Sequence, residues 1–340
     1  MIFLRYLLSP FALLFQFGVI VRQILFDLKI LKSVRTKAKV FSVGNITSGG
    51  TGKTPIVSLV GQWAERKKIT TAIIARGYGT KVEGCQEVSL SPSAAEAFGD
   101  EPVEIKSRLP LMPVFVSASK SQAALHVDQT LSPKLMIVDD GFQHLRLERD
   151  LDIVLLDTTA PDFHYWPLPM GYGRDTFVRL QKADVVILTK FNLATEVRQI
   201  WHKTRVPKNK PIFYADYLLE EITDLQTGKR IPISQLIQKK VVLMAGLANP
   251  LSFENLLCSE KMNIMEYFQF PDHHAYSKKD LEKVYKYIHS TNANCIITTE
   301  KDAVKLAPFI PFPVPILVTK LKLSFQNEKE FYEILDRHMS

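Results

Sequence analysis

Residues 42–55, SVGNITSGGTGKTP, constrain the fold of this chain more than any other part of its sequence. They join an apolar run, KVFSVG, which predicts a strand, to PIVSLVGQWAERKK, which predicts a helix. Glycines placed between a strand and a helix let backbone N–H groups wrap a phosphate, and the helix N-terminus adds its positive dipole end. The segment therefore predicts a phosphate-binding loop within an α/β fold.

Each residue type in this loop has a defined task. Lys53 is expected to reach the β- and γ-phosphates of ATP, and the Thr54 hydroxyl to coordinate Mg²⁺. Thr47 stands where the common pattern G-x-x-x-x-G-K-[ST] has its first glycine. The loop therefore departs from that pattern at one position. The predicted nucleotide contacts are Ser48, Gly49, Gly50, Thr51, Gly52, Lys53, Thr54 and Pro55.

A second acidic group for the metal follows another apolar run. Asp139 and Asp140 come directly after LMIV, where a carboxylate beside a phosphate loop binds the Mg²⁺ of a nucleotide. The alternative is an Asp-Gly turn at residues 140–141 that only closes the strand. With the loop upstream, we expect Thr54, Asp139 and Asp140 to be the metal ligands.

Short apolar runs recur from residue 39 onward, separated by helix-like segments. They are nearly continuous in Val, Ile and Leu, as in parallel strands that are buried on both faces. The runs are KVFSVG, TAIIARG, PVFVSA, KLMIVDD, LDIVLLD, DVVILTK, PIFYAD, VVLMAG, CIITTE and PILVTK. We expect a P-loop NTPase-like, mostly parallel sheet with helices on both faces.

The pattern of apolar runs separated by helix-like segments changes near residue 214. A polar stretch with Thr227 and Gly228 between two β-compatible runs predicts a hairpin. We therefore divide the chain into an N-terminal helix and basic linker (1–38), a P-loop core (39–213), a two-stranded linker (214–233) and a smaller α/β domain (234–340).

The N-terminal segment predicts a membrane-associating helix. It runs from Ser9, the expected N-cap, and Pro10 to about Leu31. Only 16 residues separate Arg5 from Arg22, so we expect the helix to lie in the interface of a membrane rather than to cross it. A hydrophobic helix docked on the protein's own core is the alternative.

The distribution of charge favours a lipid partner over nucleic acid. The formal net charge is +8, and residues 1–40 hold seven basic residues against one acidic residue. Basic residues beside an apolar segment are typical of proteins that bind anionic lipid headgroups. The three cysteines, Cys85, Cys258 and Cys295, lack metal-site or disulfide spacing and fit a reducing compartment. No feature of the sequence implies an oligomer.

Two further constellations are candidates for activating an acceptor hydroxyl. GDEP places Asp100 in a loop ahead of a helix, and PDHH places His273 in the second domain. A carboxylate and a histidine are suited to taking a proton near neutral pH. Alternatively, Asp100 only caps a helix, and His273 and His274 form a solvated turn.

Seven motifs in order resemble the tetraacyldisaccharide 4'-kinases of lipid A biosynthesis. They span residues 42–306 and comprise SVGNITSGGTGKTP, ARGYG, GDEP, VDDGFQH, AGLANP, FPDHHAY and TEKDAVKL. The resemblance implies transfer of the γ-phosphate of ATP to the 4'-hydroxyl of a tetraacyldisaccharide 1-phosphate, which forms lipid IVA. It also implies a location at the cytoplasmic face of the inner membrane, with the site in a cleft between two domains.

The resemblance also assigns roles to single residues. Lys53 is catalytic, and Asp100 with His273 is the dyad that handles the acceptor proton. The implied substrate contacts are Arg76, Lys120, Arg174 and Asp175. Two departures concern this last group: Lys120 replaces an expected arginine, and residues 173–176 read GRDT where the family commonly has Leu-Arg-Glu-Pro.

The strongest rival class is the membrane-associated switch of the MinD and ParA type, whose loop reads K-G-G-x-G-K-[ST]. Ser48 occupies the position of the signature lysine of these switches. The T-E-K-D sequence at residues 299–302 has the wrong order for the N/T-K-x-D of a GTPase. The loop therefore favours a kinase.

Overall fold

The computed structural model describes residues 5–77, 84–91, 94–247, 249–272 and 274–340. The chain forms two compact units. The first comprises residues 1–189, 196–214 and 325–340, and the second comprises residues 190–195 and 215–324. The chain passes from the first unit to the second within β8 (Ile212–Asp224) and returns at the end of β13 (Ile316–Phe325).

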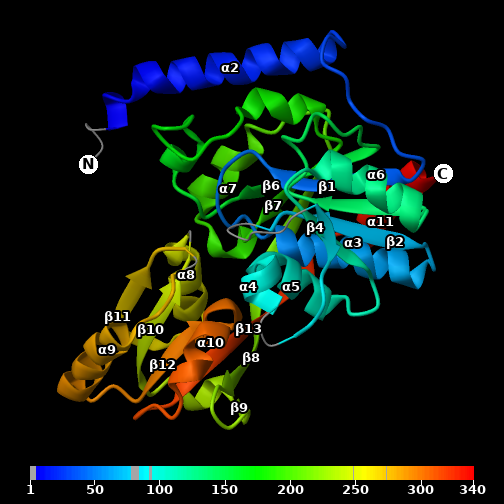
Figure 1. The fold of residues 1–340 in the computed structure, drawn as a ribbon. Helices are drawn as coiled ribbons and strands as arrows, with labels where there is room; N and C mark the ends of the chain where they lie inside the picture. Colours follow the sequence, from blue (N-terminus) through cyan, green and yellow to red (C-terminus); the bar gives the residue numbers. More distant parts are fainter. Residues whose placement is uncertain (1–4, 78–83, 92–93, 248, 273) are drawn as a thin grey trace. The chain divides into compact units, whose positions relative to one another are not determined.

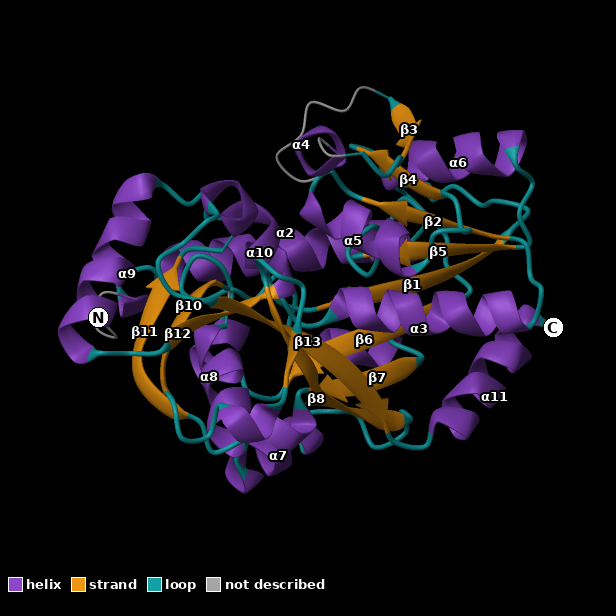
Figure 2. Cartoon of the chain, turned by 90° about the horizontal axis from the view of Figure 1, so that it is seen from below, coloured by secondary structure: helices purple, strands orange, loops and turns teal. Residues whose placement is uncertain are grey.

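The first unit is built on a parallel sheet with the strand order β7-β6-β1-β5-β2-β4-β3 (Figure 2). Each strand pairs in parallel with its neighbour, except that β3 is antiparallel to β4. These strands are β1 (Lys39–Asn45), β2 (Thr71–Ala75), β3 (Cys85–Glu87), β4 (Val114–Ser117), β5 (Leu135–Asp139), β6 (Leu151–Asp157) and β7 (Val185–Thr189). The carboxyl ends of β1 and β5 therefore lie at one edge of this sheet, which is where ligands bind in open α/β sheets.

Helices cover both faces of this sheet because its strands are apolar on both sides. On one face, Val40 packs with Val127 of α6. On the other, the ring of Phe41 stacks on Trp63 of α3 and meets His338 of α11. The helices of the first unit, apart from the N-terminal one, are α3 (Lys53–Arg66), α4 (Ala94–Phe98), α5 (Asp100–Arg108), α6 (Lys120–Thr130), α7 (Glu196–Lys203) and α11 (Glu328–Met339).

The second unit is a smaller α/β unit. Strands β11, β10, β12 and β13 pair in parallel in that order, and β9 forms an antiparallel hairpin with β8. Its elements besides β8 and β13 are β9 (Arg230–Ile231), β10 (Lys240–Gly246), α8 (Pro250–Ser259), β11 (Asn263–Phe270), α9 (Lys278–Thr291), β12 (Cys295–Thr299) and α10 (Glu300–Leu306). Short 3₁₀ helices occupy Asp162–Tyr165 and Phe177–Lys182 in the first unit, and Phe191–Leu193, Ile233–Gln235 and Ala307–Phe309 in the second unit.

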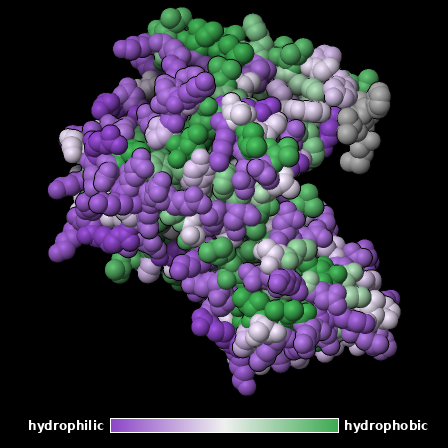
Figure 3. Space-filling model, turned by 180° about the vertical axis from the view of Figure 1, so that it is seen from behind, coloured by the Kyte–Doolittle hydropathy of each residue, from purple (hydrophilic) through white to green (hydrophobic). Residues whose placement is uncertain are grey.

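The N-terminal helix α2 (Ser9–Asp27) runs along the outside of the first unit (Figure 1). Ala12 is its one buried residue, so α2 is not a core helix. Hydrophobic side chains gather along the upper edge of the molecule, over this helix (Figure 3). Its length and composition are sufficient to cross a membrane. The exposed apolar residues of residues 5–31 are Tyr6, Leu7, Phe11, Leu13, Leu14, Phe15, Phe17, Ile20, Val21, Ile24, Leu28, Ile30 and Leu31.

All ten apolar runs form strands, and the predicted hairpin is the β8–β9 pair. Several boundaries differ from the sequence prediction. Ser9 lies inside the first turn of α2, whose N-cap is Leu8, and α2 ends at Asp27 rather than near Leu31. Asp100 lies in the first turn of α5 rather than in a loop ahead of it.

The second unit also ends earlier than the predicted domain of residues 234–340. Residues 325–340 belong to the first unit, because α11 packs its fully buried Phe331 against Phe213 and Phe325 there. The predicted linker of residues 214–233 falls within the second unit apart from Tyr214.

Candidate active site

The phosphate loop lies between the carboxyl end of β1 and the start of α3. Gly52 has a φ of 83°, a left-handed conformation that favours glycine, and Lys53 begins the helix immediately after it. Thr51 is buried and held from two sides. Its hydroxyl accepts a hydrogen bond of 2.8 Å from the Asn45 amide, and its carbonyl accepts one of 2.9 Å from the Thr189 hydroxyl. The ends of β1 and β7 thus fix the shape of the loop.

A second segment, residues 172–175, lies alongside the first residues of the loop. The Ser48 N–H donates to the Tyr172 carbonyl at 2.7 Å, and the N–H groups of Arg174 and Asp175 both donate to the Ile46 carbonyl. Thr47 and Gly173 form an antiparallel bridge. This backbone pairing brings the side chain of Arg174 to the phosphate loop, although 120 residues separate Arg174 from Lys53 in the sequence.

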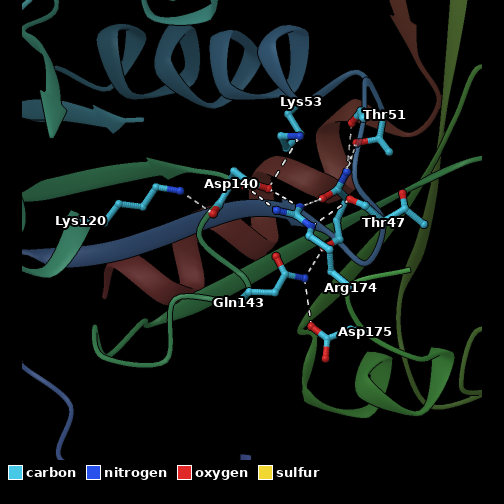
Figure 4. A network of polar contacts seen from close by, with 10 residues as sticks. Thr47, Thr51, Lys53, Lys120, Asp140, Gln143, Arg174 and Asp175 are labelled. Atoms are coloured by element: carbon cyan, nitrogen blue, oxygen red, sulfur yellow. Dashed lines mark hydrogen bonds and ion pairs between the residues drawn. The ribbon is translucent and has the colours of Figure 1, made fainter. Parts of the chain in front are cut away.

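Arg174 and Lys53 both approach Asp140 (Figure 4). The Arg174 guanidinium donates to both carboxylate oxygens of Asp140, at 2.8 and 2.6 Å, and also to the Thr47 carbonyl and the Asn45 side-chain oxygen. The Lys53 ammonium lies 3.7 Å from Asp140 Oδ1. Two cations from different parts of the chain are therefore set beside the phosphate loop, which is the charge that a polyphosphate requires.

Asp139, the last residue of β5, and Asp140, which follows it, have opposite electrostatic settings. Burial alone would raise the pKa of the Asp140 carboxyl, but the Arg174 hydrogen bonds and the Lys53 charge hold it well below its usual range. Burial raises the pKa of Asp139 to about 7, and the charge of Glu101 on α5 adds to this effect while Lys53 opposes it. Asp139 Oδ1 is buried and has no hydrogen-bond partner among the residues that the structure describes. Asp140 is thus satisfied by protein cations, whereas Asp139 is not.

Lys120 supports the segment that carries these aspartates. It is the first residue of α6, its side chain is buried, and its ammonium donates to the Asp140 carbonyl at 2.6 Å. Burial lowers the pKa of this ammonium. The next N–H, that of Ser121, donates to His144 Nε2 at 3.1 Å. The first two residues of α6 therefore hydrogen-bond to Asp140 and His144, the two ends of the segment of residues 140–144.

The loop after β5 also lies unusually close to β1. A Cβ atom on Gly44 would stand 2.6 Å from Cβ and 2.9 Å from the backbone nitrogen of Phe142. Any residue larger than glycine at position 44 would push this loop away from β1. Gln143 completes the contact by donating to the Asn45 carbonyl at 2.6 Å.

Comparison with known proteins identifies the family. The sequence model of the family described as Tetraacyldisaccharide-1-P 4'-kinase matches residues 4–340. The chain belongs to this family. A tetraacyldisaccharide 4'-kinase of Bdellovibrio bacteriovorus is 34% identical over 98% of both chains, and one of Syntrophus aciditrophicus is 32% identical over 97% of this chain and 91% of its own. Among solved structures, the "apo" form of LpxK from Aquifex aeolicus in complex with ATP superimposes with a TM-score of 0.73 at 27% identity, covering 99% of this chain and 100% of that one.

Membership of the tetraacyldisaccharide 4'-kinase family confirms the resemblance, the P-loop α/β fold and the kinase class expected from the sequence. The chain is an ATP-dependent kinase of lipid A biosynthesis. The alternative of a MinD- or ParA-type switch is therefore not supported.

The structure shows where the other predicted residues of this kinase lie. Arg76 is exposed directly after β2. Asp100 is half-buried in the first unit, while His273 lies outside the described residues, so their pairing stays a prediction. The side chains of Lys120 and Asp175 are buried, 5% and 4% exposed. Lys120 binds the Asp140 carbonyl, and Asp175 binds the amides of Gln23 and Gln143, so both contact neighbouring protein groups.

Sequence reasoning missed three residues that hold the kinase's phosphate loop: Asn45, Gln143 and Thr189. Asn45 and Thr189 are polar residues at the ends of buried strands, whereas Gln143 lies in the loop after β5. At the end of a buried strand a side-chain amide or hydroxyl needs a partner, so this pattern was the available signal for Asn45 and Thr189.

The site fits a magnesium ion. No cluster of three His, Cys, Asp or Glu side chains that could hold a metal occurs in the part of the chain that the structure describes. Mg²⁺ is usually held by one or two carboxylates together with phosphate oxygens and water, so no such cage is required. The unpartnered oxygen of buried Asp139 supplies the kind of ligand that Mg²⁺ takes.

Proposed function

We propose that this kinase transfers the γ-phosphate of ATP to the 4'-hydroxyl of a tetraacyldisaccharide 1-phosphate, forming lipid IVA. The observation that carries the proposal is the convergence of Lys53, Arg174 and Asp140 on a phosphate loop in a chain of this family. A soluble nucleotide and an acylated acceptor are the two substrates this implies.

Electrostatic stabilisation is the main contribution of the site to this reaction. The backbone N–H groups of Lys53 and Thr54, at the N-terminus of α3, and the Lys53 ammonium bind the β- and γ-phosphates. Arg174 keeps Asp140 ionised and holds it near Lys53. These groups are fixed in place before the nucleotide arrives, so little reorganisation accompanies the reaction.

Thr54, Asp139 and Asp140 would hold Mg²⁺, which would supply charge neutralisation for the phosphates when bound. Because Asp140 is already paired with Arg174, we expect Asp139 to gain more from a bound cation than Asp140 does. For the acceptor, we propose that Asp100 and His273 take and hold the proton of the attacking hydroxyl, as the family resemblance implies. Arg76 is proposed as a contact to the acceptor.

The apolar face of α2 supports a position on the cytoplasmic face of the inner membrane. Its exposed side chains include Phe11, Leu14 and Phe17, and Arg22 and Lys29 lie at its far end and just beyond it. Burial of such residues in lipid gives roughly 1.5–3 kcal/mol each, and nearby basic residues add attraction to anionic headgroups. The helix would thus keep the kinase where an acylated acceptor resides.

The direct test incubates the purified full-length protein with radiolabelled ATP and tetraacyldisaccharide 1-phosphate in mixed micelles. We expect phosphate on the lipid and none on a water-soluble glucosamine disaccharide. Lys53→Ala should lose transfer by at least about a hundredfold, because charge stabilisation dominates phosphoryl transfer. Lys67→Ala, at the exposed far end of α3, should retain it. Equal transfer by Lys53→Ala and the parent would contradict the site, and release of free phosphate without lipid product would contradict the reaction.

A further inference from the structure

Asp175 binds the N-terminal helix rather than lying open to a ligand. Its carboxylate is buried, and each oxygen accepts a hydrogen bond from a glutamine amide. Gln23 of α2 donates to Oδ1 at 2.6 Å, and Gln143 donates to Oδ2 at 3.0 Å (Figure 4 shows the latter). An ionised carboxylate only accepts, and an amide nitrogen only donates, so the polarity of both bonds is fixed.

The second partner, Gln143, belongs to the nucleotide site. The same amide nitrogen donates to the Asn45 carbonyl at 2.6 Å, and the Asn45 amide donates to the Thr51 hydroxyl inside the phosphate loop. Arg22 of α2 donates to the Gln143 carbonyl at 3.3 Å. Two consecutive residues of α2 are thus linked to Gln143, which supports the loop. Arg22 binds its carbonyl directly, and Gln23 is linked to its side chain through Asp175.

We propose that Asp175 is a positioning residue which fastens Gln23 of α2 to Gln143, so that the apolar helix holds the phosphate loop in its nucleotide-binding shape. The proposal rests on the proposed function only in treating residues 48–55 as the nucleotide site. It gives α2 a task inside the protein as well as at the membrane. It also replaces the expected substrate contact of Asp175 with an internal one.

Burial makes this link strong enough to matter. Asp175 is 4% exposed, so its hydrogen bonds are not exchanged for water. Burial raises the pKa of this carboxyl, while the bonds from Gln143 and Gln23 and the charge of Arg179 counteract the effect. A second contact of α2 with the body of the unit, the ion pair of Asp27 with Lys182, is solvent-exposed on both sides and lies outside the network. It provides a matched control.

The experiment exchanges the polarity of the Gln23–Asp175 bond in the full-length protein. Gln23→Glu places two carboxylates together, and Asp175→Asn leaves at most a neutral amide–amide bond in place of the charge-assisted one. In the double variant the new Asn donates to the new Glu and still offers its oxygen to Gln143. Affinity for ATP carrying a methylanthraniloyl fluorophore is measured without lipid, and binding to phosphatidylglycerol vesicles and thermal unfolding are measured in parallel.

We expect each single variant to bind the nucleotide at least about fivefold more weakly, the loss of one charge-assisted bond, and the double variant to recover most of this. Asp27→Asn should bind like the parent, and vesicle binding should be unchanged in all variants. Parent-like nucleotide affinity in folded Gln23→Glu, or a double variant as weak as the single ones, overturns the proposal. Absence of lipid phosphorylation by the parent would contradict the proposed function alone, because the nucleotide measurement does not use lipid.

Discussion

The guanidinium of Arg174 binds the Asp140 carboxylate through two parallel hydrogen bonds, of 2.8 and 2.6 Å. The pair joins the segment beside the phosphate loop to the segment after β5. Bidentate pairs of this kind combine charge with a fixed geometry that a lysine cannot reproduce. Arg174 therefore determines where the charge of Asp140 lies relative to Lys53.

Arg174→Lys should lower lipid phosphorylation by about 10- to 100-fold, because the fork to Asp140, Thr47 and Asn45 is lost while the charge remains. Steady-state rates at varied ATP concentration measure the effect. Arg205→Lys is the control, since Arg205 stacks on Trp201 outside the site. A parent-like rate in Arg174→Lys would show that the fork is dispensable.

Gly44→Ala should destabilise the protein by about 1–3 kcal/mol, because the new methyl group would overlap Phe142, including its backbone nitrogen. Gly18→Ala in α2 has open space around it and should be neutral or slightly stabilising. Urea unfolding of both variants measures the difference. Equal stability would mean that the loop after β5 moves freely.

Stability should fall as the pH drops from about 6.5 towards 4, in part because of His144. Burial lowers the pKa of its imidazole to about 4, and its Nε2 must stay unprotonated to accept from the Ser121 N–H. The charges that also lower this pKa are those of Lys120, Arg149, Arg22 and Arg146. Between these pH values the unfolded chain binds the proton and the folded one does not, so the stabilisation is complete above pH 6.5 and is lost below it.

His144→Gln removes this titration and keeps a hydrogen-bond acceptor. We expect the loss of unfolding free energy between pH 7 and pH 5 to be smaller in the variant, by on the order of 1 kcal/mol after allowing for the half-buried position. Urea unfolding at both pH values measures it. Identical losses in both proteins would contradict the assignment.

Changing Leu13 and Phe17 of α2 to Gln should weaken sedimentation with phosphatidylglycerol vesicles at least tenfold. These side chains are 72% and 65% exposed and lie four residues apart, on one face of the helix. Leu131→Gln, which changes an exposed apolar residue just after α6, should not alter sedimentation. Unchanged binding of the double variant would rule out this face as the membrane contact.

Asp302→Ala should destabilise the second unit by about 3 kcal/mol, since Asp302 is fully buried and its loss leaves the Gly246 N–H and the Thr299 hydroxyl without their partner. Glu282→Ala, on the exposed side of α9, should have little effect. Hydrogen exchange of β10 and β12 amides measures the local change. Equal protection in both variants would contradict the role of Asp302.

The strands of both units were predictable because most are buried on both faces and read as continuous apolar runs. Two strands were missed, β3 and β11, and both lie at the end of their unit's strand order. Most residues of β11 are exposed or half-buried, so its sequence, NIMEYFQF, carries no such run.

The site residues were predictable where one short, contiguous segment contains all the residues that define their role. Lys53 and Thr54 follow from the loop alone, and the two aspartates follow from the strand before them. The distinction between Asp139 and Asp140 depends on Arg174, which the pairing of residues 172–175 with residues 46–48 brings close. A contact between backbone segments so far apart in sequence has no local signature, and the same is true of the bond between Gln23 and Asp175.

The return of α11 to the first unit sets a limit on how this chain can fold during synthesis. The ring of His338 in α11 meets that of Phe41 in β1. Arg66 donates to the Tyr332 hydroxyl and Lys67 to the Asp336 carboxylate, at the end of the helix that begins with Lys53. The residues of α11 are synthesised after the whole second unit, so the core of the first unit cannot close until the second unit has been synthesised. A chain without α11 would retain every residue of the active site and still lack part of the structure that supports it.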